Sequence, residues 1–405
     1  MRRIARAAAL LLAALFLLAA CAPAQSDYYV GFTLGSVYVG GKAVSSAERA
    51  EASSEVAALL HAIEDEISVE RADSDVSRIN GAAAGERVAV GEHTYAILSL
   101  CKELYAQTGG AFSPALYNLS ELWGFTPAFE GQYTVPRAEP SAQAIEEALE
   151  LSDFDDITLH EDGTVSKAKS GTRIDLGGVA KGYMSDAAAS LLEGRFGASA
   201  DAILSVMSNI VLMGQKRGEN AELGYTATIE NPRALVTSGS GASQGLFAIG
   251  LSDVAISTSA DTYRFYVQDG RIYSHIIDPA AGKPSANGVI CAMVAVPRSV
   301  ENAGARADAY STAGFCMPLT QALDFYERLS REAGVSAVLI TADWKYYAVG
   351  DMDVLNRTEY AALVSPDTVI EDIFERADAA DAADAVLPCA RELEYIRTVA
   401  ERSAA

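Results

Sequence analysis

Three short segments of the sequence carry residue types that could handle a phosphate or a divalent cation. The first is Arg173-Ile-Asp-Leu-Gly-Gly-Val-Ala-Lys-Gly-Tyr183, where a strand-like start breaks at Gly177-Gly178 and a helix-like pattern follows. Glycines let the backbone approach a ligand closely, the free amides of a first helical turn favour an anion, and Lys181 adds a positive charge. The segment therefore suits a phosphate. A purely structural strand-to-helix turn with a solvated lysine is the alternative.

The second segment runs from Tyr273 to Pro284, where a β-like stretch ends in a turn rich in Pro and Gly. His275 stands in this segment and is one of four histidines in the chain. An imidazole at the end of a strand can accept a proton near neutral pH, so His275 is a candidate base. A histidine beside a turn can equally serve the structure alone, so this interpretation needs independent support.

The third segment is Ala307-Asp-Ala-Tyr-Ser-Thr-Ala313, the predicted start of a helix. Asp308 and Thr312 are four residues apart, so a carboxylate and a hydroxyl would share one helical face. Both groups are hard oxygen ligands of the kind that Mg²⁺ accepts. The alternative is an aspartate that stabilises the helix dipole, with Thr312 packed behind it.

The elements that must position these segments are a mixture of helices and short strands. Apolar residues three and four apart predict helices over Glu51–Ile67 and around Ile97–Tyr105. Between Gly163 and Val296 the sequence instead has short β-rich runs, separated by Gly, Asn and Pro. The pattern predicts the α+β class. Since no linker or internal repeat divides the chain, we expect one large folded domain over 31–350.

The composition sets the broad class of protein. Half of the 405 residues are apolar, which supports a substantial core and excludes disorder over most of the length. With 31 Lys+Arg against 54 Asp+Glu the formal charge is −23, which argues against nucleic acid as a partner. The five cysteines have neither zinc-ligand nor disulfide-framework spacing. Residues 351–405 form an acidic, Ala-rich extension, in which Asp378–Ala385 is predicted to be a solvated helix or a frayed tail.

The N-terminus has the pattern of an export signal. Three arginines precede an apolar run from Ala7 to Ala20, which predicts a signal peptide over 1–20. Its end, Leu18-Ala-Ala-Cys21, resembles the bacterial lipobox. This resemblance implies lipid attachment at Cys21, a short tether over 21–30, and contact with the membrane through the lipid anchor. A plain secretory signal with an incidental cysteine is the alternative.

The three segments, in this order, resemble the ApbE-like family of bacterial FAD:protein FMN transferases. Upstream, the stretch from Ser68 to Asn80 resembles the family's Ser…Asp-Ser…Ser…Asn segment, and 108–125 resembles its Gly-Ala-Phe…Leu-Trp-Gly block. The resemblance covers roughly residues 30–350 and implies a single α+β domain with a mixed β-sheet core and flanking helices. The lipobox fits the family's usual anchoring, which implies an exported bacterial lipoprotein on the outer face of the cytoplasmic membrane or in the periplasm.

The resemblance also implies a reaction. FAD is split at its pyrophosphate, FMN passes to a threonine hydroxyl of an acceptor flavoprotein, and AMP leaves. Such a transfer depends on positioning and charge neutralisation, and Mg²⁺ is the implied cofactor. The implied acceptor is a flavoprotein subunit of a membrane electron-transfer complex.

Matching motif positions assigns roles to individual residues. Mg²⁺ would be bound by the side chains of Asp308 and Thr312 and by the carbonyl of Ala180, and His275 would be the base. The residues implied to contact FAD are Ser68, Asn80, Trp123, Gly177, Gly178, Lys181, Asn209 and Arg264.

Several positions depart from the family pattern. Glu70 replaces a common aromatic residue, Ser113 stands where members commonly have Asp, and Met207-Ser208 replaces two glycines before Asn209. These changes leave room for altered specificity and for two alternatives to the transferase. One is an FAD-binding lipoprotein that hydrolyses FAD to FMN and AMP or stores flavin. The other is a non-catalytic adaptor with a degenerate version of the fold.

Overall fold

A computed structural model describes residues 31–218, 221–233, 245–355, 377–384 and 386–404. The predicted signal peptide, the lipid attachment at Cys21 and the tether over 21–30 lie outside the described residues. Within the described ranges, no helix combines the length and the apolar character needed to cross a membrane. Helices and antiparallel strands are both abundant, so the predicted α+β class is confirmed.

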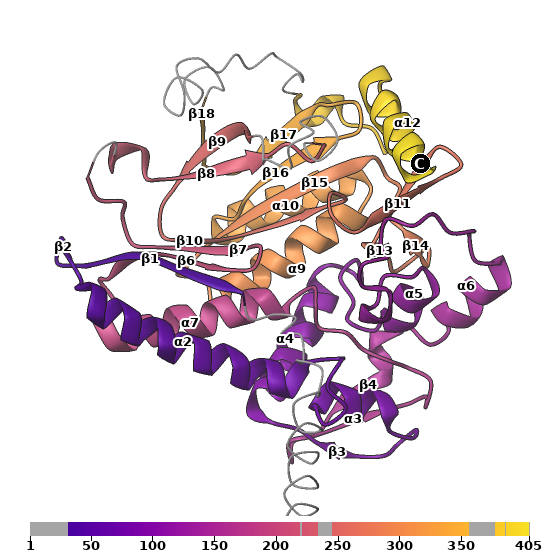
Figure 1. Ribbon diagram of the computed structural model, residues 1–405, viewed down its shortest axis with the longest axis horizontal. Coiled ribbons are helices and arrows are strands. Elements are labelled where there is room, and N and C mark those ends of the chain that lie inside the picture. The colour runs from indigo at the N-terminus through magenta and orange to yellow at the C-terminus, as the bar shows by residue number, and fades with distance from the viewer. Residues whose placement is uncertain (1–30, 219–220, 234–244, 356–376, 385, 405) are drawn as a thin grey trace, which may run out of the picture.

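An eight-stranded sheet forms the centre of the fold (Figure 1). Its strand order is β17-β16-β15-β10-β7-β6-β1-β2, and every neighbouring pair is antiparallel. The central strand β15 is buried on both faces, which accounts for its nearly unbroken apolar sequence. The strands are β1 (Phe32–Val39), β2 (Lys42–Ala43), β6 (Asp201–Val206), β7 (Asn209–Met213), β10 (Val254–Ala260), β15 (Val289–Pro297), β16 (Ser336–Thr341) and β17 (Tyr346–Val349).

Helices cover one face of this sheet (Figure 1). α9 (Ala303–Cys316) contacts β10 and β15, and α7 (Ala180–Phe196) contacts β6 and β7. α10 (Leu319–Ala333) packs beside α9, and α2 (Ser46–Ile67) packs on the outside of α7. The predicted helix over Glu51–Ile67 is confirmed by α2, and the one around Ile97–Tyr105 by α4 (Glu92–Gln107).

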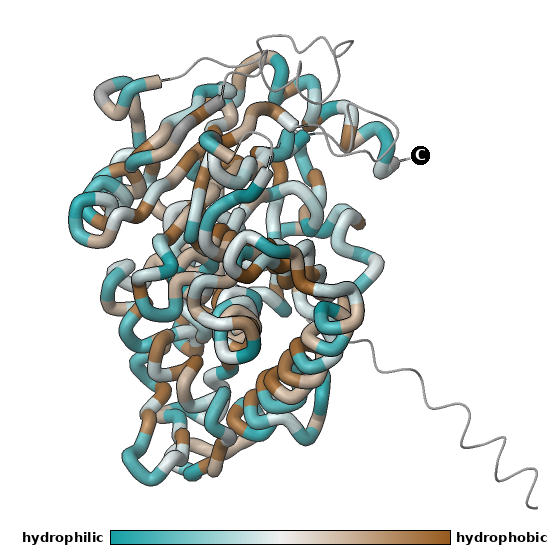
Figure 2. The backbone as a smooth tube through the Cα atoms, turned by 90° about the vertical axis from the view of Figure 1, so that its left-hand side faces the viewer, coloured by the Kyte–Doolittle hydropathy of each residue, from teal (hydrophilic) through white to brown (hydrophobic). Residues whose placement is uncertain are grey.

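The other face is covered by a second sheet, in the order β18-β9-β8. Its strands are β8 (Tyr225–Glu230), β9 (Gly245–Leu251) and β18 (Asp353–Leu355). An apolar cluster fills the space between the two sheets, with Phe247 and Ile249 from β9 facing Ile256, Met293 and Val338 of the central sheet. Hydrophilic stretches are concentrated in the outer loops (Figure 2). The central sheet is therefore buried between a helical layer and a β layer.

Shorter elements complete the fold around one end of the helical layer. α3 begins at a serine cap, since the Ser74 side chain accepts a hydrogen bond from the Ser77 N–H at 3.0 Å. The remaining helices and strands are α3 (Asp75–Gly81), α5 (Tyr117–Leu122), α6 (Ala142–Leu149), β3 (Val88–Ala89), β4 (Ile157–Leu159), β5 (Thr164–Lys167), β11 (Phe265–Gln268), β12 (Arg271–Ser274), β13 (Ile277–Asp278) and β14 (Lys283–Pro284). Single 3₁₀ turns lie at Pro127–Phe129, Phe154–Asp156, Ala221–Leu223 and Ala379–Asp381.

The C-terminal extension packs against the domain. Its helix α12 (Ala390–Ala404) lies beside β11 (Figure 1). Over 378–384, where a solvated helix or a frayed tail is predicted, the structure has the single 3₁₀ turn Ala379–Asp381, and the three aspartates are exposed. Ala377, just before this stretch, is buried in the main core, so this part of the extension is also attached to the domain.

Candidate active site

The segment 173–183 forms an extended stretch that enters α7, in agreement with its sequence pattern. Asp175 lies just before the two glycines, and its Oδ1 accepts a hydrogen bond from the Gly177 N–H at 2.7 Å. α7 begins at Ala180, and the Lys181 Nζ donates to the Gly177 carbonyl at 2.6 Å. The lysine is therefore folded back over the glycine pair, which places its charge at the start of the helix.

Two side chains from distant parts of the sequence hold this extended stretch. The Asn80 amide donates to the Ile174 carbonyl at 2.9 Å and accepts from the Ile174 N–H at 2.8 Å. Lys167 is buried, and its ammonium donates to the carbonyls of Asn80 (2.7 Å) and Thr172 (2.9 Å). Burial, reinforced by the charge of Arg173, lowers the pKa of Lys167. In this structure Asn80 positions the loop that carries Asp175, and its contact with FAD stays a prediction.

α9 brings Asp308 next to the start of α7. The Lys181 Nζ lies 3.2 Å from the Asp308 Oδ2, and the Gly182 N–H donates to the same oxygen at 3.2 Å. On β10 the Ser257 hydroxyl lies 3.1 Å from the Asp308 Oδ1. Since the Asp308 side chain is 4% exposed, these three donors replace the water that would otherwise solvate its charge.

Further oxygen atoms surround Asp308. The Thr312 hydroxyl donates to the Asp308 carbonyl at 3.1 Å and lies 3.3 Å from the Ser259 hydroxyl. Gly178 faces the same hydroxyl, because a Cβ atom at this glycine would lie 3.8 Å from the Thr312 Oγ1. Ala180, the predicted carbonyl ligand, is fully buried in the first turn of α7. The structure thus brings together Gly178, Lys181, Asp308 and Thr312, which lie in two distant motifs.

The chemistry of these donors fits a hard cation. A carboxylate, hydroxyls and a backbone carbonyl are the oxygen ligands that Mg²⁺ prefers. In the part of the chain that the structure describes, no group of three or more His, Cys, Asp or Glu side chains could form a metal site by itself. Mg²⁺ is commonly held by one or two carboxylates together with substrate phosphates, and Asp308 with Thr312 fits a site of that kind.

The close contact between α7 and α9 sets the spacing of these groups. A Cβ atom at Gly182 would lie 2.1 Å from the Gly304 carbonyl oxygen, so the two helices meet where both lack side chains. Asp186 of α7 accepts hydrogen bonds from the N–H groups of Gly304 (2.7 Å) and Ala305 (2.9 Å). It therefore caps α9, whose own cap residue Asn302 provides no side-chain hydrogen bond. Burial raises the pKa of Asp186 to about 6, although these N–H groups lower it.

Gly182→Ala is expected to destabilise the protein by about 1–3 kcal/mol or more, because the new methyl group would overlap the Gly304 carbonyl. Gly194 on the same helix provides the matched control, since nothing lies within 4 Å of its Cβ position. Gly194→Ala should therefore raise stability slightly, by up to about 1 kcal/mol. Thermal unfolding compares the two variants. An unchanged Tm in Gly182→Ala would show that α7 and α9 are not locked at this contact.

His275 lies between β12 and β13, close to Arg264. Its backbone N–H donates to the Arg264 carbonyl at 2.9 Å, and its Nδ1 lies 3.3 Å from the same oxygen. Burial, with the positive charges of Arg264 and Lys181, lowers the pKa of His275 to about 3. The imidazole is therefore neutral at physiological pH, and its Nδ1 carries the proton that faces the carbonyl.

Asp175 joins Lys181 and Arg264 in one electrostatic cluster beside His275. Burial raises the pKa of Asp175, while the Gly177 N–H, Lys181 and Arg264 lower it. The Arg264 guanidinium also lies over the Tyr133 ring, 5.2 Å from its centroid. Asp175 was missed as a site residue by the sequence analysis, although a carboxylate two residues before a glycine pair was a signal that could have found it.

Trp123 belongs to an aromatic cluster next to His275. Its ring is 1% exposed and stacks on Tyr273 with centroids 5.7 Å apart, and its Nε1 donates to the Gly282 carbonyl at 2.9 Å. Phe125 continues the cluster, with its ring centroid 6.5 Å from that of His275. In the structure Trp123 packs within the aromatic cluster beside His275. Its contact with flavin stays a prediction.

The two other predicted FAD residues are also buried. The Asn209 Oδ1 lies 3.1 Å from the Ser257 hydroxyl, and its Nδ2 donates to the Gly304 carbonyl at 3.4 Å, so Asn209 belongs to the Asp308 cluster. Ser68 lies at the end of α2, where its carbonyl accepts a hydrogen bond from the Ser74 hydroxyl at 2.5 Å. Ser68 thus joins α2 to α3.

Two departures from the family pattern lie in turns or loops near the cluster. Met207 has φ of 52°, a conformation that favours glycine, and its side chain is 46% exposed in the turn between β6 and β7. The Ser113 hydroxyl accepts a hydrogen bond from the Ala115 N–H at 3.2 Å. Neither side chain disrupts the strands or helices that carry the cluster.

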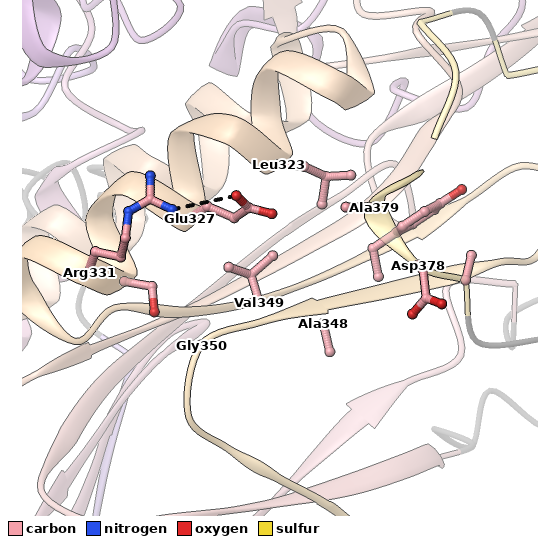
Figure 3. Close-up of a pocket in the computed structure, with 11 residues that line it drawn as sticks. Leu323, Glu327, Arg331, Ala348, Val349, Gly350, Asp378 and Ala379 are labelled. Carbon is pink, nitrogen blue, oxygen red and sulfur yellow. Dashed lines mark ion pairs between the residues drawn. The ribbon is translucent and has the colours of Figure 1, made fainter. Parts of the chain in front are cut away.

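A cavity of about 310 Å³ lies away from these residues, between α10 and β17 (Figure 3). Leu323, Glu327 and Arg331 line it from α10, and Val349 lines it from β17. Glu327 and Arg331 form an ion pair at 3.6 Å on its rim. None of the predicted site residues lines this cavity.

Comparisons with known proteins agree with this fold and with these motifs. The model of the ApbE family matches residues 33–339. The FAD:protein FMN transferase of Treponema pallidum (strain Nichols) is 32% identical over 315 residues, which covers 74% of this chain and 79% of the relative. The enzyme of the same name from Vibrio cholerae serotype O1 is 30% identical over 288 residues, covering 70% of this chain and 80% of the relative.

Solved structures give the same result. The flavin transferase ApbE from Vibrio cholerae superposes with a TM-score of 0.62 at 25% identity, covering 79% of this chain and 97% of that one. The ApbE protein from Thermotoga maritima superposes with a TM-score of 0.63 at 25% identity, covering 82% of this chain and 99% of that one. Fold and motifs together define a flavin transferase of the α+β class. The chain belongs to the ApbE family, and the predicted family, fold and enzyme class are confirmed.

Proposed function

We propose that the protein transfers FMN from FAD to a threonine side chain of an acceptor flavoprotein, in an Mg²⁺-dependent reaction that releases AMP. The meeting of α7 and α9 is the observation that carries this proposal. It places the Lys181 ammonium and the Gly182 N–H of α7 beside the Asp308 carboxylate, and Thr312 lies one turn further along α9. A pyrophosphate with a bound divalent cation requires this combination of positive charge, N–H groups and hard oxygens. The names of the relatives support the same reaction.

In the proposed reaction the acceptor threonine oxygen attacks the phosphorus of the FMN half of FAD. The bond from this phosphorus to the bridging oxygen breaks, and AMP leaves with that oxygen. The threonine proton goes to His275, whose Nε2 is free to accept it because Nδ1 faces the Arg264 carbonyl. Lys181 and Arg264 stabilise the phosphate charge. Mg²⁺ bound at Asp308 and Thr312 would supply further charge neutralisation.

The test is AMP release from FAD by the complete chain, with Mg²⁺ and with excess chelator. We expect AMP only when Mg²⁺ is present. Equal AMP in both samples would contradict the metal dependence. AMP with free FMN and an unlabelled acceptor would favour the hydrolase alternative, and no AMP under any condition would favour flavin storage or the adaptor.

We also propose that the protein is an exported lipoprotein, anchored through Cys21 on the outer face of the cytoplasmic membrane or in the periplasm. The apolar run and the Leu18-Ala-Ala-Cys21 sequence support this proposal. Its acceptor would then be a flavoprotein subunit of a membrane electron-transfer complex on the same side of the membrane.

Cys21→Ser is expected to move the protein out of the membrane fraction, because the thiol that would carry the lipid is lost. Fractionation of cells that express the wild-type and variant chains measures this change. An unchanged membrane-bound fraction in Cys21→Ser would contradict the lipid anchor, since a lipid on sulfur requires the cysteine. Cys101→Ser provides the control, because that thiol is buried in the folded domain.

A further inference from the structure

A buried ion cluster joins the C-terminal helix to the body of the domain. The Arg233 side chain is 1% exposed, and its Nη2 donates to the Asp261 Oδ2 at 2.9 Å. The Arg233 Nε lies 2.9 Å and 3.0 Å from the two carboxylate oxygens of Glu392, which comes from α12 and has a side chain 2% exposed. One guanidinium thus binds two carboxylates from parts of the chain that are far apart in sequence.

Apolar contacts extend this junction along α12. Tyr395, Ile396 and Val399 of the helix pack against Phe265 and Val267 of β11. The Tyr395 ring also lies under the Arg233 guanidinium, 4.8 Å from its centroid. The buried face of α12 therefore covers β11 and the ion cluster together.

The start of α12 is also fixed to the domain. The Cys389 N–H donates to the Ala342 carbonyl at 3.2 Å, and Arg391 lies over the Trp344 ring at 4.9 Å. Gly288 accommodates the chain just before the helix, since a Cβ atom there would lie 2.5 Å from the Val386 Cβ. The helix is therefore seated at its start as well as along its buried face.

The segment held by these contacts carries Arg264, which contacts His275 of the candidate active site. Asp261 follows β10 directly and is fixed by Arg233, and Phe265 begins β11 and is covered by α12. Between them lies Arg264, whose carbonyl accepts the His275 N–H at 2.9 Å and faces the His275 Nδ1. A shift of this segment would therefore move the group that orients the imidazole.

We propose that α12 is a positioning element of the active site, in which Glu392 acts through Arg233 and Asp261 to hold Arg264 and His275 in place. Residues 390–404 lie beyond 33–339, the residues that match the family model, so the device belongs to this chain's C-terminal extension. The expected effect on catalysis rests on the proposed function. The expected effect on the mobility of the Arg264 segment does not depend on it.

Three variants of the complete chain test the role of the Glu392 carboxylate against a control on the exposed side of α12. Glu392→Ala removes one of the two carboxylates and leaves a gap beside a buried guanidinium. Glu392→Gln keeps the shape and one hydrogen-bond acceptor, so it should restore most of the wild-type behaviour. Glu394→Ala on the exposed side of the same helix is the matched control.

The experiment measures hydrogen exchange of residues 261–276 without FAD, and then kcat and KM for AMP release. Glu392→Ala should exchange at least about tenfold faster over this segment than the wild type and Glu394→Ala. Its kcat should fall by about tenfold or more, with a smaller change in KM, at a temperature where circular dichroism shows it folded. Glu392→Gln should recover most of the wild-type exchange protection over 261–276 and most of the wild-type kcat.

Two results would overturn the inference. Unchanged exchange over 261–276 in Glu392→Ala would show that α12 does not hold this segment. Faster exchange with unchanged kcat would show that the helix braces the fold without positioning the active site. If the wild-type chain released no AMP, the proposed function would fail, and the exchange data would still decide whether α12 holds the segment.

Discussion

Replacing Asp308 with alanine is expected to abolish FAD cleavage while the protein stays folded. Asp308 supplies the carboxylate at the point where α7 and α9 meet, 3.2 Å from the Lys181 ammonium. Without it, a divalent cation would lose its strongest protein ligand, and the negative charge of the pyrophosphate would be poorly neutralised. We expect AMP release to fall by about a thousandfold or more, equivalent to several kcal/mol of transition-state stabilisation.

Asp308→Asn separates the charge from the packing. The amide keeps the volume and an acceptor for the Gly182 N–H, so its stability should be closer to that of the wild type than the stability of Asp308→Ala. Asp324→Ala on the exposed face of α10 is the control, and it should change neither activity nor Tm. AMP release and thermal unfolding of the three variants check the prediction. Full activity in Asp308→Asn would remove this residue from the metal site.

His275→Ala should reduce FMN transfer by about 10²–10⁴-fold while FAD binding changes little. The imidazole is held by the Arg264 carbonyl and is neutral, so it can take the threonine proton without first losing one. His61→Ala is the control, because His61 is exposed on α2. FMN transfer rates and FAD dissociation constants, measured for the same variants, show whether transfer is lost while FAD binding is kept. Equal transfer rates in wild type and His275→Ala would eliminate this residue as the base.

The pH dependence gives this prediction a second readout. Because burial and the neighbouring cations lower the pKa of His275 to about 3, the active neutral form persists well below neutral pH. The deficit of His275→Ala should therefore be constant between about pH 5 and about pH 8. The same lowered pKa makes the stability of the fold depend on pH. The unfolded chain binds the proton more readily, so His275 should reduce the free energy of unfolding as pH falls from about 6.5 towards 3.

Local patterns in the sequence predicted local features of the structure. Apolar spacing located α2 and α4, because their buried residues, such as Val56, Leu60, Ile97 and Leu104, repeat at the helical period. The two glycines before Lys181 indicated the start of α7, because a break in the chain is also visible within a few residues of sequence.

Contacts between distant segments could not be predicted in this way. Asn80 binds the backbone of Ile174, 94 residues away, and the Gly182 N–H reaches Asp308 across 126 residues. Neither pairing leaves a periodic signal, so the role of Asn80 in supporting the Asp175 loop emerged only from the fold.

The C-terminal helix shows the same limit. The sequence pattern made no prediction for 390–404, because the apolar face that packs on β11 consists of only a few residues, among them Tyr395, Ile396 and Val399. Glu392 is buried because Arg233, 159 residues earlier in the sequence, neutralises it. The acidic, Ala-rich composition of 351–405 therefore did not indicate that this helix packs on the domain.

The most direct test of the central claim is the intact mass of a threonine-containing acceptor domain after incubation with the complete chain, FAD and Mg²⁺. The account predicts that the acceptor gains the mass of one FMN group, with one AMP released for each labelled acceptor, and that an acceptor with its threonine replaced by alanine gains nothing. Release of AMP and free FMN with no change in acceptor mass would contradict the transferase and leave a hydrolase.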